Sequence, residues 1–313
     1  MQILVTGCCG FIGSHISKNL LDKRYVVIGV DNLNNYYDVA VKEKNKALLC
    51  EFSNFTFIKD DFCNVNFDHY DIDYVIHLAG YAGVRYSIEN PATYFENNIM
   101  QSIVLLQKCV KHNVKKFVFA SSSSVYGNIK AESFQEDMVC NQMVSPYACS
   151  KKCLEELCST FSNIYGLQTV ALRFFTVYGP RGRPDMAPYK FIYNIVNEIP
   201  IYMYGDGSSM RDYTYIDDIV NGVIQATFIE SSNPFTILNL GNNNPCSLID
   251  FISLCEKVCM KQAIVITKDM HPSDVKYTCA NIDKAINEIN YKPSISLHEG
   301  LTKLHLWITN NKI

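Results

Sequence analysis

The chain has 313 residues, of which 48% are apolar and 19% are charged, and its 31 acidic and 28 basic side chains leave a formal charge of −3. This composition supplies a full apolar core, which excludes a disordered chain, and the charge argues against a nucleic-acid binder that relies on bulk positive charge. No run of about 20 apolar residues is present, so we expect neither a membrane-spanning helix nor a membrane partner. The first residues lack the pattern of a secretion signal, and the thirteen scattered cysteines have no zinc spacing, so we expect a cytoplasmic protein with reduced thiols and no metal site.

Short apolar runs rich in β-branched residues alternate with longer amphipathic stretches over roughly the first 175 residues. The predicted strands are Ile3–Thr6, Val26–Val30, Phe55–Ile58, Tyr74–His77, Phe117–Ser121 and Thr169–Arg173, and the predicted helices are Ser14–Lys23, Tyr94–His112 and Tyr147–Tyr165. Such alternation favours a parallel sheet with helices on both faces, which is a doubly wound, Rossmann-like α/β fold.

After Arg173 the alternation weakens, and the chain is broken by proline and glycine. Shorter elements are expected at Pro200–Tyr204, Phe235–Leu240, Ser247–Lys261 and Ile264–Thr267. We therefore predict a larger domain of residues 1–174, completed by a return segment near 214–242, and a smaller α/β lobe of about 175–213 and 243–313. A ligand site is expected in the cleft between them.

Three glycines, Gly7, Gly10 and Gly13, follow the first predicted strand with the spacing Gly-x-x-Gly-x-x-Gly, and a helix is expected to begin there. Without Cβ atoms such a loop turns tightly and lets its backbone approach a pyrophosphate, and a helix amino terminus adds a partial positive charge. Many glycine-rich loops are only turns. The position of this one between a first strand and a helix favours a dinucleotide site that includes Phe11 and Ile12.

Polar residues at the ends of the next two strands extend this predicted site. Asp31 ends the second strand, 18 residues after Gly13. An acid there accepts hydrogen bonds from both ribose hydroxyls and repels a 2′-phosphate, so we expect NAD rather than NADP, with Asn32 beside it. Asp61 and Phe62, after the third strand, are expected to hold the amino group and the face of the adenine.

Tyr147 and Lys151 stand four residues apart on a predicted helix and therefore share one face. A phenol with a pKa of about 10 is a poor base at neutral pH, but a neighbouring ammonium favours the phenolate. Such a pair can remove the proton of an alcohol while hydride leaves the same carbon. The spacing also arises by chance on surface helices, so it indicates catalysis only together with the glycine loop.

Four serines end the fifth predicted strand, at the edge where parallel sheets bind their ligands. Ser122, Ser123 and Ser124 are expected to bind a substrate alcohol and to relay its proton to Tyr147. A serine-rich strand end would be unremarkable without the other motifs.

With these motifs the chain resembles the extended short-chain dehydrogenase/reductase family of nucleotide-sugar epimerases and dehydratases over essentially its whole length. The resemblance is carried by Thr6–Gly13, His77–Gly80, Ser121–Gly127, Tyr147 with Lys151, Tyr178–Pro180, Arg211–Tyr213 and Asp217–Asp218. Within the family, the segments most similar to the branch that epimerises UDP-glucuronic acid at C4 are Asp31–Asp38, Ala82–Ser87 and Arg173–Ala187. The resemblance implies NAD-dependent conversion of UDP-glucuronic acid to UDP-galacturonic acid through a transient 4-keto sugar, with hydride returned to the opposite face.

The resemblance also implies roles for individual residues. Tyr147 takes the C4 hydroxyl proton with Ser122 as its partner, while Lys151 lowers the pKa of the phenol and holds the nicotinamide ribose. Further cofactor contacts are implied at Leu78, Ala79, Asn98 and Tyr178, and substrate contacts at Arg85, Ser122, Thr176, Arg183, Arg211 and Asp274. Thr176 and Arg183 are the main candidates to hold the sugar carboxylate, and Arg85 is a weaker candidate. The helices at Tyr94–His112 and Tyr147–Tyr165 imply a homodimer.

Related activities compete with this interpretation. A dehydratase is disfavoured because Ser123 and Ser124 stand where dehydratases carry an acidic pair. A UDP-glucuronate decarboxylase stays open because a 4-keto acid loses carbon dioxide readily, although decarboxylases typically have Asn at the position of Thr176. A 4-epimerase for neutral UDP-hexoses also stays open, but it would not need Arg183. A non-catalytic dinucleotide-binding relative is expected to have lost Tyr147 or Lys151, and both are present.

Overall fold

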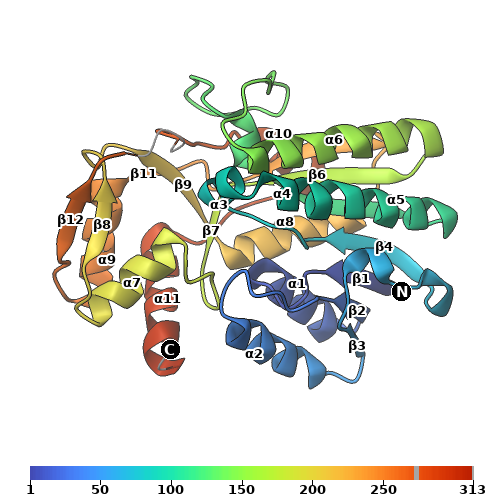
Figure 1. Ribbon diagram of the computed structural model, residues 1–313, viewed down its shortest axis with the longest axis horizontal. Helices are drawn as coiled ribbons and strands as arrows, with labels where there is room; N and C mark the ends of the chain where they lie inside the picture. The colour runs from blue at the N-terminus through green and yellow to red at the C-terminus, as the bar shows by residue number, and fades with distance from the viewer. Residues whose placement is uncertain (271–274, 312–313) are drawn as a thin grey trace.

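The computed structural model describes residues 1–270 and 275–311. A seven-stranded parallel sheet with the order β10-β6-β5-β4-β1-β2-β3 forms the centre of the larger part of the molecule (Figure 1). Its strands are β1 (Gln2–Thr6), β2 (Val26–Val30), β3 (Phe55–Ile58), β4 (Ile72–His77), β5 (Lys116–Ser122), β6 (Gln168–Phe174) and β10 (Phe235–Leu240). All six strands predicted in the first part of the chain are present, and the doubly wound α/β fold is confirmed.

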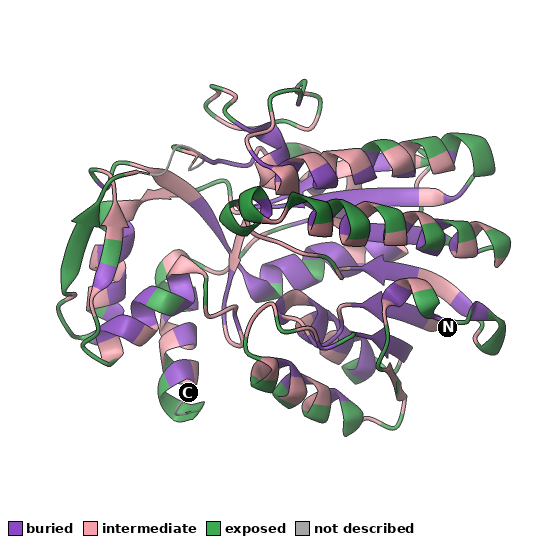
Figure 2. Ribbon diagram, in the orientation of Figure 1, coloured by how far each residue is buried: buried purple, intermediate pink, exposed green. Residues whose placement is uncertain are grey.

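Helices cover both faces of this sheet, and the side chains of β1 show why. Successive side chains on a strand alternate between its faces. Ile3 and Val5 belong to one buried cluster, which includes residues of α1 (Phe11–Asp22) and α8 (Ile216–Phe228). Leu4 belongs to a second cluster with residues of α5 and α6, whose bounds are Gln101–Lys111 and Pro146–Tyr165. The strands are therefore largely buried between two helical layers (Figure 2).

Three local features of the larger part differ from the predicted elements. Helix α1 begins at Phe11 rather than Ser14, directly after the last turn of the glycine loop. Helix α2 (Val39–Cys50) was not predicted because its apolar face is weak, and it begins where the Asp38 carboxylate accepts a hydrogen bond from the Ala40 amide. The long helix predicted at Tyr94–His112 is α4 (Pro91–Phe95), a π-helical segment (Glu96–Met100) and α5 in succession.

The chain after β6 builds a smaller group of elements, drawn on the left of Figure 1. Its strands form a three-stranded sheet of order β11-β9-β7 and a two-stranded sheet of β12 and β8. The elements after β6 that have not yet been given are β7 (Thr176–Tyr178), α7 (Ala187–Val196), β8 (Ile201–Tyr204), β9 (Met210–Tyr215), β11 (Pro245–Ser247), α9 (Leu248–Cys259), β12 (Val265–Lys268), α10 (Asp283–Ile289) and α11 (Leu297–Asn311). One short helix, α3 (Val84–Glu89), lies earlier in the chain, after β4. Helices α8 and α10 and strand β10 pack with the main sheet instead.

Within residues 1–270 and 275–311, no helix is both long and apolar enough to cross a membrane. The same residues contain no group of three or more His, Cys, Asp or Glu side chains arranged to hold a metal ion.

Candidate active site

A cavity of about 430 Å³ opens at the carboxyl ends of the sheet strands, and it spans the point between β1 and β4 where the strand order reverses. Parallel α/β sheets bind ligands at such a point. The glycine loop forms one wall of the cavity. A Cβ on Gly13 would lie 2.1 Å from the Gly7 carbonyl oxygen, and one on Gly7 would lie 2.8 Å from the Ala79 amide nitrogen. The backbone of the loop is therefore packed too closely to accept side chains at Gly7 and Gly13, and this compact cradle leads into the amino terminus of α1 as a pyrophosphate site requires.

The ribose end of the cavity is built around Asp31, which is 8% exposed. Its carboxylate accepts hydrogen bonds from the amides of Cys9 (3.1 Å) and Leu33 (2.9 Å), so its orientation is fixed. The Asn32 side chain donates to the Asp61 carboxylate at 2.6 Å, which ties the ends of β2 and β3 together. Lys42 of α2 lines the same end, and burial lowers the pKa of its ammonium while the charge of Asp31 raises it.

The catalytic end of the cavity is lined by Ser122, Ser123 and Ser124 from β5 and the turn after it, and by Tyr147 and Lys151 from α6. Helix α6 begins here because the Ser145 hydroxyl caps it, accepting from the Ala148 amide at 3.1 Å, and Pro146 occupies its first turn. The Lys151 ammonium donates to the Ala120 carbonyl at 2.8 Å, which anchors the helix to β5. Tyrosine, lysine and serines therefore lie around one space.

The pKa values of this pair are set mainly by burial. Burial raises the pKa of Tyr147 above its usual value, while a hydrogen bond with Ser122 and the positive charge of Arg183 oppose the rise. Burial lowers the pKa of Lys151 to about 8. In the protein without ligands the phenol is therefore protonated at neutral pH, and additional positive charge near Tyr147 would favour the phenolate.

Asn98 lies behind the cavity rather than in its wall. It belongs to the π-helical segment and is 1% exposed. Its amide accepts from the Tyr81 backbone N–H at 2.8 Å and donates to the Tyr81 carbonyl at 3.0 Å and the Ser150 hydroxyl at 3.1 Å. Asn98 thus joins the loop after β4 to the catalytic helix, and the extra residue of a π turn aims its side chain there.

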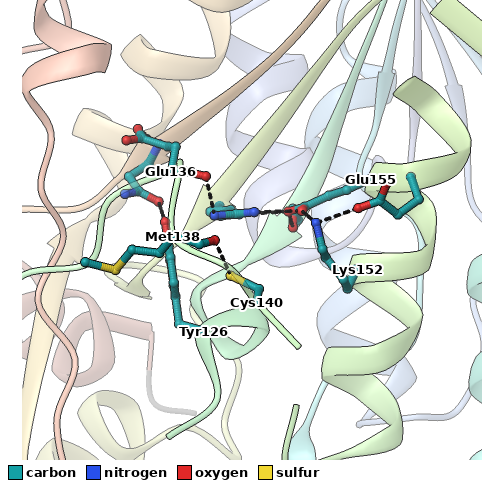
Figure 3. Close-up of polar contacts among 10 residues, drawn as sticks. Tyr126, Glu136, Met138, Cys140, Lys152 and Glu155 are labelled. Atoms are coloured by element: carbon teal, nitrogen blue, oxygen red, sulfur yellow. Dashed lines mark hydrogen bonds and ion pairs between the residues drawn. The ribbon is translucent and has the colours of Figure 1, made fainter. Parts of the chain in front are cut away.

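A buried ion pair supports the middle of α6, two turns after Tyr147 (Figure 3). Arg173 at the end of β6 donates from Nε to Glu155 Oε1 (2.9 Å) and from Nη2 to Oε2 (2.8 Å). The Ser121 hydroxyl donates to the same carboxylate at 2.6 Å, so the pair connects β6, α6 and β5. Although burial raises the pKa of Glu155, the Arg173 charge more than offsets it, and the carboxyl stays ionised. Arg173 also donates to the Glu136 carbonyl (3.4 Å), which holds the long loop that leads into α6.

A second cavity of about 280 Å³ adjoins this region and is lined mainly by the smaller group of elements. Arg85, Lys190 and Arg211 give it positive charge. The Arg85 guanidinium lies 4.6 Å from the centre of the Tyr204 ring, a cation–π distance. Arg183 lines the first cavity and Asp185 the second, and they form an ion pair (Arg183 Nη2 to Asp185 Oδ2, 2.6 Å).

The model of the NAD dependent epimerase/dehydratase family matches residues 3–241. This match spans the glycine loop, the serines, the tyrosine–lysine pair and the loop that carries Arg183.

The chain belongs to the NAD dependent epimerase/dehydratase family.

Relatives in sequence and in structure match this chain over nearly its whole length. A UDP-glucuronate 4-epimerase of Thermodesulfobacterium geofontis is 42% identical over 316 residues, which cover 98% of this chain and 96% of that protein. The crystal structure of UDP-glucuronic acid 4-epimerase from Bacillus cereus, in complex with UDP-glucuronic acid and NAD, has a TM-score of 0.93 and 37% identity, covering 99% of this chain and 100% of that one. A UDP-glucose 4-epimerase of Thermotoga maritima, solved with UDP-glucose, is 29% identical with a TM-score of 0.91, covering 100% of each chain.

The fold places most of the predicted site residues of this family member around the first cavity. Those that line it are Gly7, Gly10, Phe11, Ile12, Gly13, Asp31, Asn32, Asp61, Phe62, Leu78, Ala79, Ser122, Ser123, Ser124, Tyr147, Lys151, Thr176 and Arg183. Arg85 and Arg211 line the second cavity. Asp274 lies outside the described residues.

Tyr178 is not brought into either cavity. It is 2% exposed, and its hydroxyl donates to the Leu297 carbonyl at 3.4 Å, so it packs against α11 while its neighbours Thr176 and Val177 line the first cavity.

Sequence reasoning missed four cavity residues that follow Asp31, namely Asn34, Tyr36, Tyr37 and Lys42. The run Asn34–Tyr37 was part of the family resemblance, and that was the available signal. Lys42 was missed because α2 was not predicted. Its ammonium donates to the Asn34 carbonyl (3.0 Å) and side-chain oxygen (2.8 Å), so helix and loop shape the ribose end together.

Proposed function

We propose that this protein is an NAD-dependent 4-epimerase that interconverts UDP-glucuronic acid and UDP-galacturonic acid. One observation carries the proposal: a single cavity holds the glycine cradle, the Tyr147–Lys151 pair and the Arg183 guanidinium. The relatives named for this activity match nearly the whole chain.

The first cavity suits the cofactor. Gly7 and Gly13 let the loop pack tightly enough for its backbone to face a pyrophosphate, Asp31 would hold the adenosine ribose, and Lys151 would hold the nicotinamide ribose. When bound, NAD takes up and returns hydride at C4 of the sugar. Its nicotinamide ring would add the positive charge that favours the Tyr147 phenolate.

The chain's own residues manage the proton and the sugar. Tyr147 accepts the proton of the C4 hydroxyl and returns it, and Ser122 binds the same oxygen. Because Tyr147 interacts with the charge of Arg183 as well as with Ser122, the base and the carboxylate site belong to one electrostatic unit. The second cavity would take the nucleotide diphosphate on Arg85, Lys190 and Arg211.

The Arg183 guanidinium and Thr176 would hold the sugar carboxylate. Burial lowers the pKa of Arg183, but Asp185 more than offsets this, so the guanidinium is a permanent cation in the cavity wall. After oxidation at C4 the substrate is a β-keto acid, which loses carbon dioxide when the bond from C5 to the carboxylate carbon lies perpendicular to the plane of the ketone. A fixed guanidinium would hold the carboxylate away from that orientation and would thereby favour epimerisation over decarboxylation.

Product analysis tests the proposal. Purified protein with catalytic NAD is incubated with UDP-glucuronic acid, and the products are followed by NMR and mass spectrometry. A galacto-configured product of unchanged mass is expected. A product lighter by carbon dioxide would identify a decarboxylase, and turnover of UDP-glucose with none of the acid would identify a neutral-hexose epimerase.

The proposed assembly is a homodimer formed by α5 and α6. Their layer exposes large apolar side chains, including Met100 (61% exposed), Ile164 (65%) and Tyr165 (56%), and Figure 2 shows exposed residues along these helices. Such exposure is typical of a surface that a partner covers. Sedimentation is expected to give twice the 35.6 kDa chain mass, and a species of 35.6 kDa alone at micromolar concentration would contradict the dimer.

The proposed organisation keeps the predicted division, with residues 1–174 and about 214–242 binding NAD and about 175–213 and 243–313 binding the nucleotide sugar, except that α10 packs with the main sheet. We also propose a cytoplasmic location, since all thirteen cysteines are free thiols.

A further inference from the structure

Tyr36 stands at the meeting point of three loops. It follows Asp31 by five residues on the loop after β2, and it lines the first cavity with Arg183. Its ring makes edge contacts with Tyr81 (5.6 Å between ring centres) and Tyr86 (5.4 Å), both of which follow β4. The cofactor-binding loop thus contributes a side chain to the wall that the proposed substrate contacts.

The Tyr36 hydroxyl is seated in a prepared position. It donates to the Ala82 carbonyl, which also accepts from the Tyr94 hydroxyl at 2.8 Å. Gly83, beside it, has a φ of 102°, and a Cβ there would lie 2.5 Å from the Tyr36 hydroxyl oxygen. The ring of Tyr94 in turn lies 6.1 Å from that of Tyr147. Tyr36 is therefore connected to the catalytic Tyr147 through the Ala82 carbonyl and Tyr94.

The Arg183 guanidinium contacts both this ring and a carboxylate. Its central carbon is 5.3 Å from the centre of the Tyr36 ring, within the range of a cation–π interaction. On Asp185 it donates from Nε to Oδ1 (3.0 Å) and from Nη2 to Oδ2 (2.6 Å), which leaves the Nη1 donors outside that pair. Two contacts of different kinds thus restrain the plane of one guanidinium.

We propose that Tyr36 is a positioning residue that holds Arg183 for a ligand carboxylate, and so gives the site its preference for an acidic over a neutral UDP-sugar. The inference rests on the proposed function, because it takes Arg183 as the group that meets the sugar carboxylate. The aromatic face restrains the guanidinium without competing for its N–H donors, whereas a carboxylate such as Asp185 occupies them. When the sugar carboxylate arrives, the ring keeps the guanidinium in place while its hydrogen bonds are redistributed.

The test compares dissociation constants of UDP-glucuronic acid and UDP-glucose for the NAD-loaded protein by calorimetry. Tyr36→Leu removes the ring, so binding of the acid is expected to weaken about tenfold while binding of UDP-glucose changes less than twofold. Tyr36→Phe keeps the ring and is expected to retain the preference. Tyr86→Leu is the matched control, because Tyr86 touches Tyr36 but lines neither cavity, and it is expected to alter neither constant.

A double-mutant cycle separates positioning of Arg183 from a general effect on folding. In an Arg183→Met background, Tyr36→Leu is expected to cause less than a further twofold loss, and a full tenfold loss there would overturn the inference. Bound NAD and the melting temperature verify the fold, and Tyr36→Met replaces Tyr36→Leu if the latter does not fold. A Tyr36→Leu protein that keeps the wild-type preference overturns this inference alone, whereas a wild-type protein without any preference overturns the proposed carboxylate site as well.

Discussion

Two arginine–carboxylate pairs of this protein have nearly the same bond lengths and very different surroundings. Arg173 and Glu155 are each 1% exposed, and their pair joins β6 to the catalytic helix. Arg183 and Asp185 are 17% and 49% exposed, and they lie two residues apart in one loop at the cavity wall. A pair that is buried on both sides is costly to break, whereas a pair whose carboxylate is half exposed adds less to stability. The first is therefore suited to hold the site rigid, and the second to exchange partners with a ligand.

The same difference runs through the two halves of the site. The cofactor side is formed by backbone at the start of α1, at Gly13, and by buried side chains that follow strands of the main sheet, such as Asp31. The substrate side is formed by side chains that are at least partly exposed, such as Arg85 on the short helix α3 and Arg183 on the loop after β7. We infer that the chemistry is preorganised by the sheet, and that the choice of sugar is made by these more exposed side chains.

Tyr147→Phe has the largest expected effect, and it separates the chemical step from ligand binding on the cofactor side and the substrate side. Because the phenol is the only base assigned to the C4 hydroxyl, turnover should fall about 10³-fold. Dissociation constants for NAD and the UDP-sugar should change little, since the ring and its packing remain. Steady-state rates and calorimetry measure both quantities, and wild-type turnover by this variant would refute the mechanism.

Glu155→Gln breaks the buried pair and leaves the Arg173 charge without its partner. The free energy of unfolding is expected to fall by about 3–5 kcal/mol. Asp185→Asn removes the matching charge from the half-exposed pair and is expected to cost clearly less, about 1 kcal/mol. Urea unfolding of the two variants measures this contrast directly. Equal losses would show that the two pairs do not differ in the way their burial indicates.

The pH dependence of stability tests Lys151, whose ammonium is buried and, within the described residues, has no carboxylate partner of the kind that Arg173 and Arg183 have. Its pKa is about 8 in the folded protein against 10.5 ordinarily, so between these values the unfolded chain holds a proton that the folded one has released. The free energy of unfolding therefore rises with pH between about 8 and 10.5. Relative to Lys151→Met, wild-type protein without NAD should gain about 3 kcal/mol across the window, measured by urea unfolding. Parallel profiles for the two proteins would contradict the burial of a charged Lys151.

Gly13→Ala tests the cofactor side alone. The new Cβ would meet the Gly7 carbonyl oxygen, so the loop must shift, and NAD affinity is expected to fall by tenfold to about 100-fold. Gly166→Asn is the control, because Gly166 lies at the end of α6 with nothing within 4 Å of an added Cβ, and Asn tolerates its left-handed conformation. The NAD that remains bound after purification measures the effect, and equal NAD content in both variants would exclude the cradle.

Much of the candidate site could be predicted because its residues follow strands directly. Gly7, Asp31 and Ser122 each stand at or just after the end of a strand, and parallel strands bring their carboxyl ends to one edge. Tyr147 and Lys151 were predictable as a pair because helical spacing alone places them on one face. The π-helical segment that interrupts the predicted helix at Asn98 was not predictable, because a π turn depends on the contacts that the Asn98 side chain makes with Tyr81 and Ser150.

The sequence by itself determined the six strands of roughly the first 175 residues, the glycine cradle and the tyrosine–lysine pair, since each depends on spacings within a few residues. Only the tertiary structure decided that Tyr36 meets Arg183, 147 residues further along the chain, and that Glu155 meets Arg173. It also placed Tyr178 outside the cavity, against α11. Such contacts depend on how crossover connections bring distant loops to one sheet edge and on which side chains are left room there, and no local periodicity records either.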